Sequence, residues 1–237
     1  MYIQQSRSIL RMLALGLLGA WTGLSQAATL GFSGQLDLIE TNTGTGRYAG
    51  ASPGQLFSGV FSYGTLADAT TDPQFPGDYD FSTPPYSGSI TDGTTQTTGA
   101  PGEIVQVSVS DDQIVDAASA AIVNAILGTT LAAGDTVDTA DIDTQYLYTS
   151  GGSIVFGLTF VPLDSTAFSG TGFDNFPPES GNIDRAFFFI SEFDDQDNLV
   201  YQGFGELDTL APVPAPPAIW LFGTGLLGLI GYARRRG

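Results

Sequence analysis

The stretch Leu30-Gly31-Phe32-Ser33-Gly34-Gln35-Leu36-Asp37-Leu38 decides the fold class of this chain. Its apolar side chains fall on one side of an extended backbone, with Leu30 and Phe32 ahead of Leu36 and Leu38. This two-residue period is typical of a strand with one face in a core and the other in water. The pattern returns along the chain and predicts further strands at 56–63, 104–109, 145–149, 153–160, 186–193 and 199–207.

The segment between residues 109 and 128 follows a helical period instead. Ser110 or Asp111 is suited to cap the N-terminus of a helix, and Gly128 is suited to end it. The apolar stripe of this predicted helix consists of Ile114, Ala118, Ala121, Ile122, Ala125 and Ile126. About seven strands and one packed α-helix predict a mainly β fold, an antiparallel β-sandwich or jelly-roll-like domain.

The charges are unevenly distributed over the 237 residues. All 25 acidic residues lie between Asp37 and Asp208, and Arg47 and Arg185 are the two cations of the segment 28–211, which gives this segment a formal charge of −23. A surface of this sign repels phosphate backbones, so we expect no nucleic-acid partner. Histidine and cysteine are both absent, which excludes a Ser-His-Asp triad, a thiolate nucleophile and the usual zinc site.

Residues 1–27 have the three parts of a bacterial export signal. Two arginines precede the apolar run 12–21, which is too short to span a bilayer comfortably. Small residues follow at Ser25 and Ala27, so we predict that signal peptidase cleaves between Ala27 and Ala28. The alternatives are an uncleaved anchor or a buried helix of the fold. The acidic β-rich domain would then occupy residues 28–211 and a C-terminal segment residues 212–237.

The segment 212–237 has a different composition from the acidic domain. Three prolines within 213–217 fix φ and lack amide donors, so this part is predicted to be a semi-rigid extended spacer. The uncharged run 218–233 follows, and as a helix it would extend ~24 Å, slightly less than a ~30 Å hydrocarbon core. Three arginines at 234–236 follow the run. The positive-inside rule places them in the cytoplasm and the acidic domain outside, the orientation that the export signal also requires.

These C-terminal features together resemble the PEP-CTERM sorting signal of Gram-negative bacteria. The sorting motif is Val213-Pro214-Ala215-Pro216, in which Ala215 stands where glutamate is typical. The membrane-anchor residues that match are Trp220, Leu221, Phe222, Gly223, Gly225, Gly228, Tyr232, Arg234, Arg235 and Arg236. The resemblance is confined to this tail and says nothing about the chemistry of the acidic domain.

The resemblance implies that an exosortase is a partner. The tail would hold the domain on the periplasmic side of the inner membrane, and processing near 213–217 would release it to the cell surface or the extracellular space. Members of the family accompany exopolysaccharide production and biofilm formation. We therefore expect a secreted cell-surface or extracellular-matrix protein with a non-enzymatic structural or carbohydrate-associated role, and exopolysaccharide as a further partner. A simple single-pass anchored surface protein is the alternative.

Carboxylates are the abundant reactive groups of the acidic domain. Asp194, Asp195, Asp197 and Asn198 crowd a predicted hairpin, and oxygen ligands at this spacing could hold a weakly bound Ca²⁺. A solvated acidic turn explains the same residues, and no other cofactor is expected. The acidic residues of a second predicted loop are Asp135, Asp138, Asp141 and Asp143.

Sugar chemistry is the other possibility that the composition leaves open. Two carboxylates flanking a sugar can hydrolyse a glycosidic bond, so a secreted carboxylate-dependent glycoside hydrolase is the alternative function. Among 25 acidic residues some pair is expected by chance; no catalytic residue is assigned, and we expect no enzyme activity. Aromatic side chains that could either stack on polysaccharide or fill the core are Tyr79, Phe81, Tyr86, Tyr146, Tyr148 and Phe173.

Overall fold

The alternating segments of the sequence form strands in a computed structural model, which describes residues 28–71, 73–82, 85–99, 103–148, 151–162, 167–173, 176 and 185–212. The strands are β1 (Ala28–Gln35), β2 (Leu38–Asn42), β3 (Leu56–Tyr63), β4 (Thr70–Thr71), β5 (Asp78–Ser82), β6 (Ser87–Thr91), β7 (Gln96–Thr98), β8 (Ile104–Ile114), β9 (Thr136–Leu147), β10 (Ser153–Val161), β11 (Arg185–Phe193) and β12 (Leu199–Pro212). The α-helix of the described residues is α2 (Ala117–Leu127), and a short 3-10 turn, η2, covers Leu66–Asp68. The predicted mainly β, antiparallel fold with one helix is confirmed.

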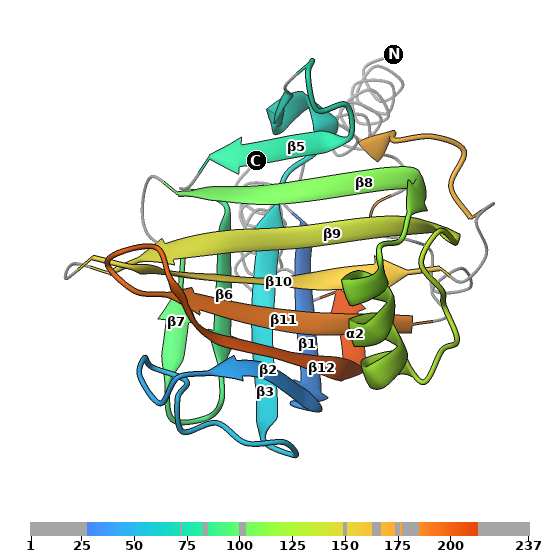
Figure 1. Ribbon diagram of the computed structural model, residues 1–237. Helices are drawn as coiled ribbons and strands as arrows, with labels where there is room; N and C mark the ends of the chain where they lie inside the picture. The colour runs from blue at the N-terminus through green and yellow to red at the C-terminus, as the bar shows by residue number, and fades with distance from the viewer. Residues whose placement is uncertain are drawn as a thin grey trace, which may run out of the picture.

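The strands pair in two groups that share β12. We call the first group the β9 sheet; its order is β4-β5-β8-β9-β10-β11-β12-β2. The second group, the β3 sheet, has the order β12-β1-β3-β6-β7. The first half of β12 pairs with β11 and its second half with β1. In Figure 1 the strands of the β3 sheet run behind those of the β9 sheet and crosswise to them.

Glycines mark the place where β12 passes from one sheet to the other. A Cβ on Gly205 would collide with the carbonyl oxygen of Gln35, and a Cβ on Gly34 would collide with the carbonyl oxygen of Glu206. Beside this contact the β1–β12 register shifts, so that Asp208 has no opposite residue. Strands that change sheets at bends and bulges form the corners of orthogonally packed sheets. The close backbone approach at Gly205 therefore sets how the two sheets cross.

Phenylalanine side chains fill the space between the two sheets. The ring centroids of Phe61 on β3 and Phe156 on β10 lie 5.8 Å apart, and those of Phe57 on β3 and Phe188 on β11 lie 5.4 Å apart. All four side chains are buried, and each contributes about 1.5–3 kcal/mol of hydrophobic stabilisation. Because one core serves both sheets, the arrangement is consistent with the predicted β-sandwich.

Leu38 departs from the prediction for the opening stretch. Leu30, Phe32 and Leu36 are buried in the main core. The chain then turns between β1 and β2, which reverses the alternation, and Leu38 packs into a second cluster beneath α2. The prediction also missed β2, β4, β5, β6 and β7, which have two to five residues each.

The helix begins later than predicted. Asp116 is the N-cap, and its side chain accepts hydrogen bonds from the N–H groups of Ala118 and Ser119, both at 2.8 Å. β8 continues to Ile114, which is 73% exposed and does not join the helix. Gly128 ends the helix in the left-handed conformation, as predicted.

The buried face of α2 also differs from the predicted stripe. Ala118, Ala121 and Ala125 are exposed. Ile122 and Ile126 of the predicted stripe do pack on the β9 sheet, and Leu127, which was not predicted, joins them in the cluster with Val161, Phe187 and Phe204.

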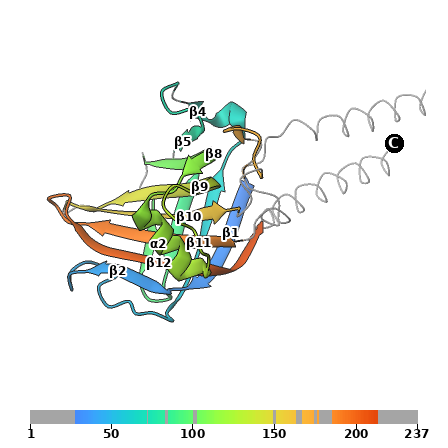
Figure 2. The ribbon, with the colours of Figure 1, turned by 45° about the vertical axis from the view of Figure 1, so that its right-hand side comes forward.

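The export signal and the C-terminal tail lie outside the described residues. Among the described residues, no helix has the length and apolarity needed to cross a bilayer. The described chain starts in β1 and ends in β12, which pair with each other so that Leu30 lies opposite Pro212. Figure 2 shows β1 and the end of β12 side by side at one end of the β3 sheet.

Candidate functional site

The hairpin turn between β11 and β12 contains the four residues of the predicted weak Ca²⁺ site. The Asp194 carboxylate accepts hydrogen bonds from the N–H groups of Gln196 and Asn198, both at 2.9 Å, and from the Asn198 side-chain amide at 3.1 Å. These bonds, that of the Asn198 side chain first, lower the pKa of Asp194. Asp197 has a φ of 59°. The Asp194 carboxylate thus organises the turn, and calcium binding here stays a prediction.

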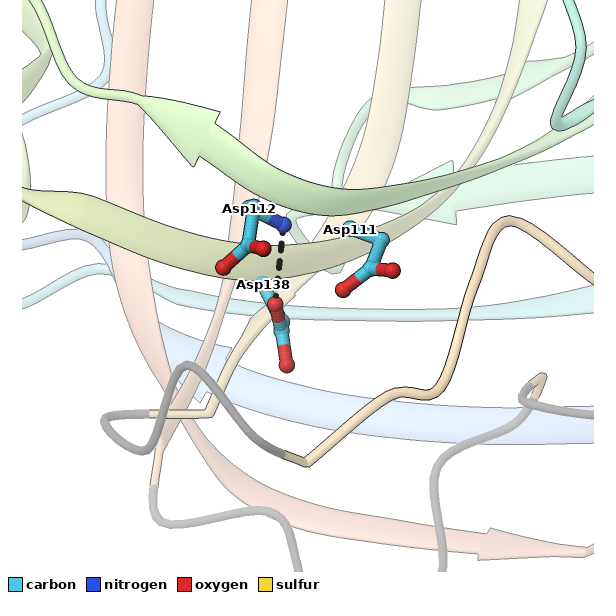
Figure 3. Close-up of side chains that lie close together, drawn as sticks. All are labelled: Asp111, Asp112 and Asp138. Carbon is cyan, nitrogen blue, oxygen red and sulfur yellow. Dashed lines mark hydrogen bonds between the residues drawn. The ribbon is translucent and has the colours of Figure 1, made fainter.

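Three other aspartates lie together at a bulge in β8. Asp111 and Asp112 from β8 and Asp138 from β9 have carboxylate oxygens within 4.8 Å of one another (Figure 3). Asp138 is fully buried, and its two oxygens accept hydrogen bonds from the N–H groups of Asp112 at 3.1 Å and Phe168 at 2.8 Å. Partial desolvation and the carboxylates of Asp112 and Asp138 raise the pKa of Asp111. Asp138 therefore ties the bulge to the 167–173 segment.

A row of carboxylates crosses the outer face of the β9 sheet, on β5 and β9. Asp78 and Asp80 of β5 and Asp141 and Asp143 of β9 flank β8, and the pairing register aligns them across it. The side-chain amide of Gln106 on β8 donates a hydrogen bond of 2.8 Å to Asp80. We call these four aspartates the acidic ladder. The predicted acidic loop around Asp141 and Asp143 is therefore wrong, because both residues lie within a strand.

Desolvation and the neighbouring carboxylates raise the pKa values of two members of the acidic ladder, Asp141 and Asp143. Desolvation is the larger cause for Asp143, followed by the charges of Asp141, Asp78 and Asp80, and its pKa is about 7. Desolvation raises the pKa of Asp141 to about 6, although a hydrogen bond with Thr159 opposes the shift. Both side chains are half-buried. Asp141 and Asp143 can therefore bind and release protons near neutral pH.

Among the residues that the structure describes, the outward positions paired in the β3 sheet carry no ionisable side chain. The strand register aligns the outward residues in three main rows and a short fourth row, Gln35 and the 62% exposed Leu56, which borders them beside Ser33 and Ser58. The polar row is Gln96, Thr91, Ser58, Ser33 and Thr209; the second row is Thr98, Ser89, Val60, Gly31 and Ala211; the third row is Ser87, Ser62 and Thr29. We call these three rows the neutral face. All of its residues are exposed or half-buried.

A hydrogen bond joins two side chains of the neutral face, Ser33 and Thr209, whose hydroxyl oxygens are 2.7 Å apart. Asp208 borders the face at the β12 bulge. Sequence reasoning missed the neutral face, because it followed the apolar partners of each strand. Serine and threonine alternate with the core residues in 58–62 and 87–91, and this signal could have revealed the face.

Arg47 lies against two of the predicted aromatic residues. Its guanidinium carbon is 4.9 Å from the ring centroid of Tyr146 and 5.0 Å from that of Tyr148. Glu192, which is buried, accepts hydrogen bonds from the Arg47 N–H at 2.8 Å and from the Tyr148 hydroxyl. Desolvation and Glu192 raise the pKa of Tyr148. Both rings also pack on the core, so Arg47 and the core occupy the ring surfaces that a sugar would need.

The other predicted aromatic residues contribute to the core. Tyr79 and Phe81 are buried. Tyr86 and Phe173 are half-buried, and their ring centroids lie 5.3 Å and 5.7 Å from that of Phe81. Core packing, one of the two roles considered for these residues, is what the geometry supports.

An exposed ring that was not predicted stands beside a depression near β4 and β5. Phe75 is 61% exposed. The depression has a volume of about 310 Å³ and is lined by Thr71, Pro73, Phe75, Pro76, Gly77, Asp78, Tyr79, Thr171 and Gly172. Asp78 belongs both to this depression and to the acidic ladder. An aromatic side chain with adjacent polar groups is a composition found in ligand sites.

The predicted sorting residues Val213 to Pro216, the anchor residues from Trp220 to Arg236 and the cleavage residue Ala27 lie outside the described residues. Ala28 is the first residue of β1 and is exposed. No protein-family model, curated protein or solved structure matches this chain.

Proposed function

We propose that the chain is an exported cell-surface or extracellular-matrix protein of a Gram-negative bacterium, sorted by an exosortase through its C-terminal tail. Its role is non-enzymatic, structural or carbohydrate-associated, within an exopolysaccharide matrix or biofilm. The observation that carries the proposal is the order of features in 213–236: a proline motif, an uncharged run and a triple arginine. This order suits a processed membrane anchor better than a plain one, because a plain anchor needs no proline cluster at its outer end.

The geometry of the acidic domain supports this topology. β1 begins directly after the predicted cleavage point, and β12 ends directly before the proline motif. Because the two strands pair antiparallel, the segments on both sides of the domain attach at the same place. A domain attached in this way can be held on a membrane during export and released by one cut near 213–217.

The architecture also fits an extracellular role. The sandwich is the better supported of the two predicted architectures, because β8 to β12 each pair with the next strand, whereas a jelly roll is built from Greek keys. A formal charge of −23 for residues 28–211 favours solubility outside the cell.

Intact-mass measurement tests the sorting proposal. The full chain is expressed in a Gram-negative host with and without an exosortase, and the membrane and extracellular fractions are analysed. With the enzyme, we expect an extracellular species that begins at Ala28 and ends within 213–217; without it, we expect a membrane species that retains 218–236. Replacing Arg234, Arg235 and Arg236 by alanine should prevent processing, whereas Trp220→Phe should preserve it.

Two results would contradict the sorting proposal. A single-pass anchored protein would keep its tail in both hosts. A protein that retains residues 1–27 in the cytosolic fraction would contradict export itself.

A specific observation favours the hydrolase alternative. Asp143, with a pKa of about 7, is protonated often enough at neutral pH to act as a general acid, and Asp78, Asp80 and Asp141 offer carboxylates nearby. Release of reducing sugar from a panel of polysaccharides tests this function. Turnover that Asp143→Asn abolishes would support a hydrolase, and no turnover with any substrate would remove the alternative.

A further inference from the structure

We infer that the neutral face of the β3 sheet is a binding surface for an uncharged polysaccharide. This inference deepens the carbohydrate-associated role and depends on the proposed function for the presence of such a polymer outside the cell. The first observation is the distribution of charge. Residues 28–211 contain 25 carboxylates, yet the outward side chains of five paired strands are hydroxyls, amides and small or apolar groups.

The chemistry of the three rows matches that of a sugar ring. A pyranose has hydroxyls around its edge and C–H groups on its faces. Hydroxyls and amides of the polar row can both donate and accept hydrogen bonds, which carboxylates cannot do. The second row, which lies between the polar row and the third row, contains Val60, Gly31 and Ala211. Val60 and Ala211 have short, apolar side chains, and glycine has none. A sugar lying over Val60 would thus have polar partners on both sides.

The spacing of the rows suits an extended chain. Paired strands lie ~4.8 Å apart, so the five side chains of the polar row extend over about 19 Å. The strand spacing of ~4.8 Å is comparable with the length that each sugar adds to an extended polysaccharide chain. A polymer lying across the strands can therefore repeat the same contact from Thr209 through Ser58 to Gln96, and several weak contacts add through a shared backbone.

The size of the face argues against a second copy of this chain as the occupant. Five strands and three rows of outward residues cover roughly 400 Å². Stable protein interfaces bury about 800 Å² on each partner and have an apolar centre. Val60, 39% exposed, is the apolar side chain in the middle of this face, and the 62% exposed Leu56 lies at its border, so the face has no continuous apolar centre. Two domains of formal charge −23 would also repel each other on approach.

The same charge selects among polysaccharides. An anionic polymer with uronic acids would have to approach Asp208 at the margin of the face and the carboxylates of the rest of the domain. Beyond a Debye length of about 8 Å at physiological salt this repulsion is screened, but a polymer in contact with the face lies within that distance. An uncharged polymer experiences no such repulsion.

Affinity electrophoresis of the full-length chain, kept soluble with a mild non-ionic detergent, tests the inference. The gels contain galactomannan, hydroxyethyl cellulose or dextran as uncharged probes, or alginate as the anionic probe. We expect at least one uncharged polymer to retard the protein and alginate not to do so. Ser58→Asp places a carboxylate at the centre of the polar row and should weaken binding at least tenfold, because the charge would lose water without gaining a partner.

Two matched variants separate binding from folding. Thr130→Asp adds the same charge to an exposed position in the loop after α2, on the side of the β9 sheet, and should leave binding within twofold. Ser58→Thr keeps the hydroxyl and should also retain binding. Thermal melting of each variant identifies any that fail to fold; Ser58→Asn, which is uncharged, then replaces Ser58→Asp and should weaken binding less than the charge does.

Three outcomes would overturn the inference: no retardation by any uncharged polymer, equal retardation by alginate, or equal binding by Ser58→Asp and Thr130→Asp. Loss of binding in Phe75→Ala with Ser58→Asp unaffected would assign the sugar to the depression at β5 and would also overturn it. Sorting is read from the mass of the exported protein, whereas binding is read on the purified chain. The sorting proposal and the binding inference can therefore fail independently of each other.

Discussion

The outer faces of the two sheets differ in charge although both follow the same alternation of core and solvent residues. On the β9 sheet, four of the outward positions of β5 and β9 are the aspartates of the acidic ladder. On the β3 sheet, the outward positions are mostly serine and threonine. The contrast shows that the charge of −23 on residues 28–211 is not spread evenly. One face titrates near neutral pH, and the other can contact an uncharged polymer.

The largest effect should come from disturbing the corner that separates the two faces. Gly205→Ala places a methyl group against the carbonyl oxygen of Gln35, and because both groups are backbone-anchored, we expect a loss of about 3 kcal/mol or more in the free energy of unfolding. Gly50→Ala is the control: an added Cβ there meets nothing within 4 Å, so the change should stay within about 0.5 kcal/mol. Urea denaturation measures the free energy of unfolding of both variants. Equal stability of the two would contradict the role assigned to the close backbone approach at Gly205.

Adding one carboxylate to each face should show the difference between them directly. Gln106→Asp removes the hydrogen bond to Asp80 and adds a negative charge between the aspartates of the ladder, so we expect a loss of about 2 kcal/mol at pH 8. Ser58→Asp on the neutral face should cost less than about 0.5 kcal/mol. Similar losses for both variants at pH 8 would mean that the two faces have the same electrostatic character.

Removing a charge from the acidic ladder should stabilise the domain. The native pKa of Asp143 is about 7, above its ordinary value of 3.8. The unfolded chain therefore releases this proton first, and stability present below pH 4 is lost as the pH rises to about 7. Asp143→Asn should be more stable than the parent by about 1 kcal/mol at pH 8 and should depend less on pH between 4 and 7.

Asp194→Asn should destabilise the domain, the opposite of Asp143→Asn, because the pKa of Asp194 is lowered in the native state. The stability that Asp194 contributes is present above its ordinary pKa and is lost as the pH falls through the native value. Melting temperature measured against pH distinguishes the two variants. An Asp143→Asn variant with the same pH profile as the parent would contradict the assigned titration of the ladder.

Calcium should have the smallest effect. A weak site of the extracellular class has a Kd of about 10⁻⁴–10⁻³ M, so 1 mM Ca²⁺ should add roughly 0.4–1.4 kcal/mol or less. If the hairpin binds the ion, Asp194→Asn should abolish the rise in melting temperature and Asp111→Asn should not. No rise at millimolar Ca²⁺ would contradict the metal prediction, and loss of the rise in Asp111→Asn alone would move the site to the β8 bulge.

The long strands could be predicted from the sequence because their apolar residues alternate without interruption. Phe57 and Phe61 identify β3, and Val105 and Val107 identify β8. Short strands such as β6 and β7 were missed, because serine, threonine and glycine occur as often in turns as in strands. They are held in place by pairing with β3, which is a property of the folded chain.

The surface features depend on register, which sequence does not specify. Asp78 and Asp141 are 63 positions apart and are aligned only because β5 and β9 both pair with β8. Ser58 and Thr209 meet on one row for the same reason. The helix start at Asp116 was misplaced because several aspartates precede the helix, and only the end of β8 at Ile114 decides among them.

Hydrogen–deuterium exchange with and without a bound uncharged polysaccharide tests most directly whether the two faces divide the functions of the domain. With galactomannan, or the uncharged polymer that retards the protein most, slower exchange should be confined to peptides covering 28–35, 56–63, 87–98 and 207–212, which carry the neutral face. Slower exchange in 78–82 and 136–147 instead would place the ligand on the acidic ladder and contradict the account.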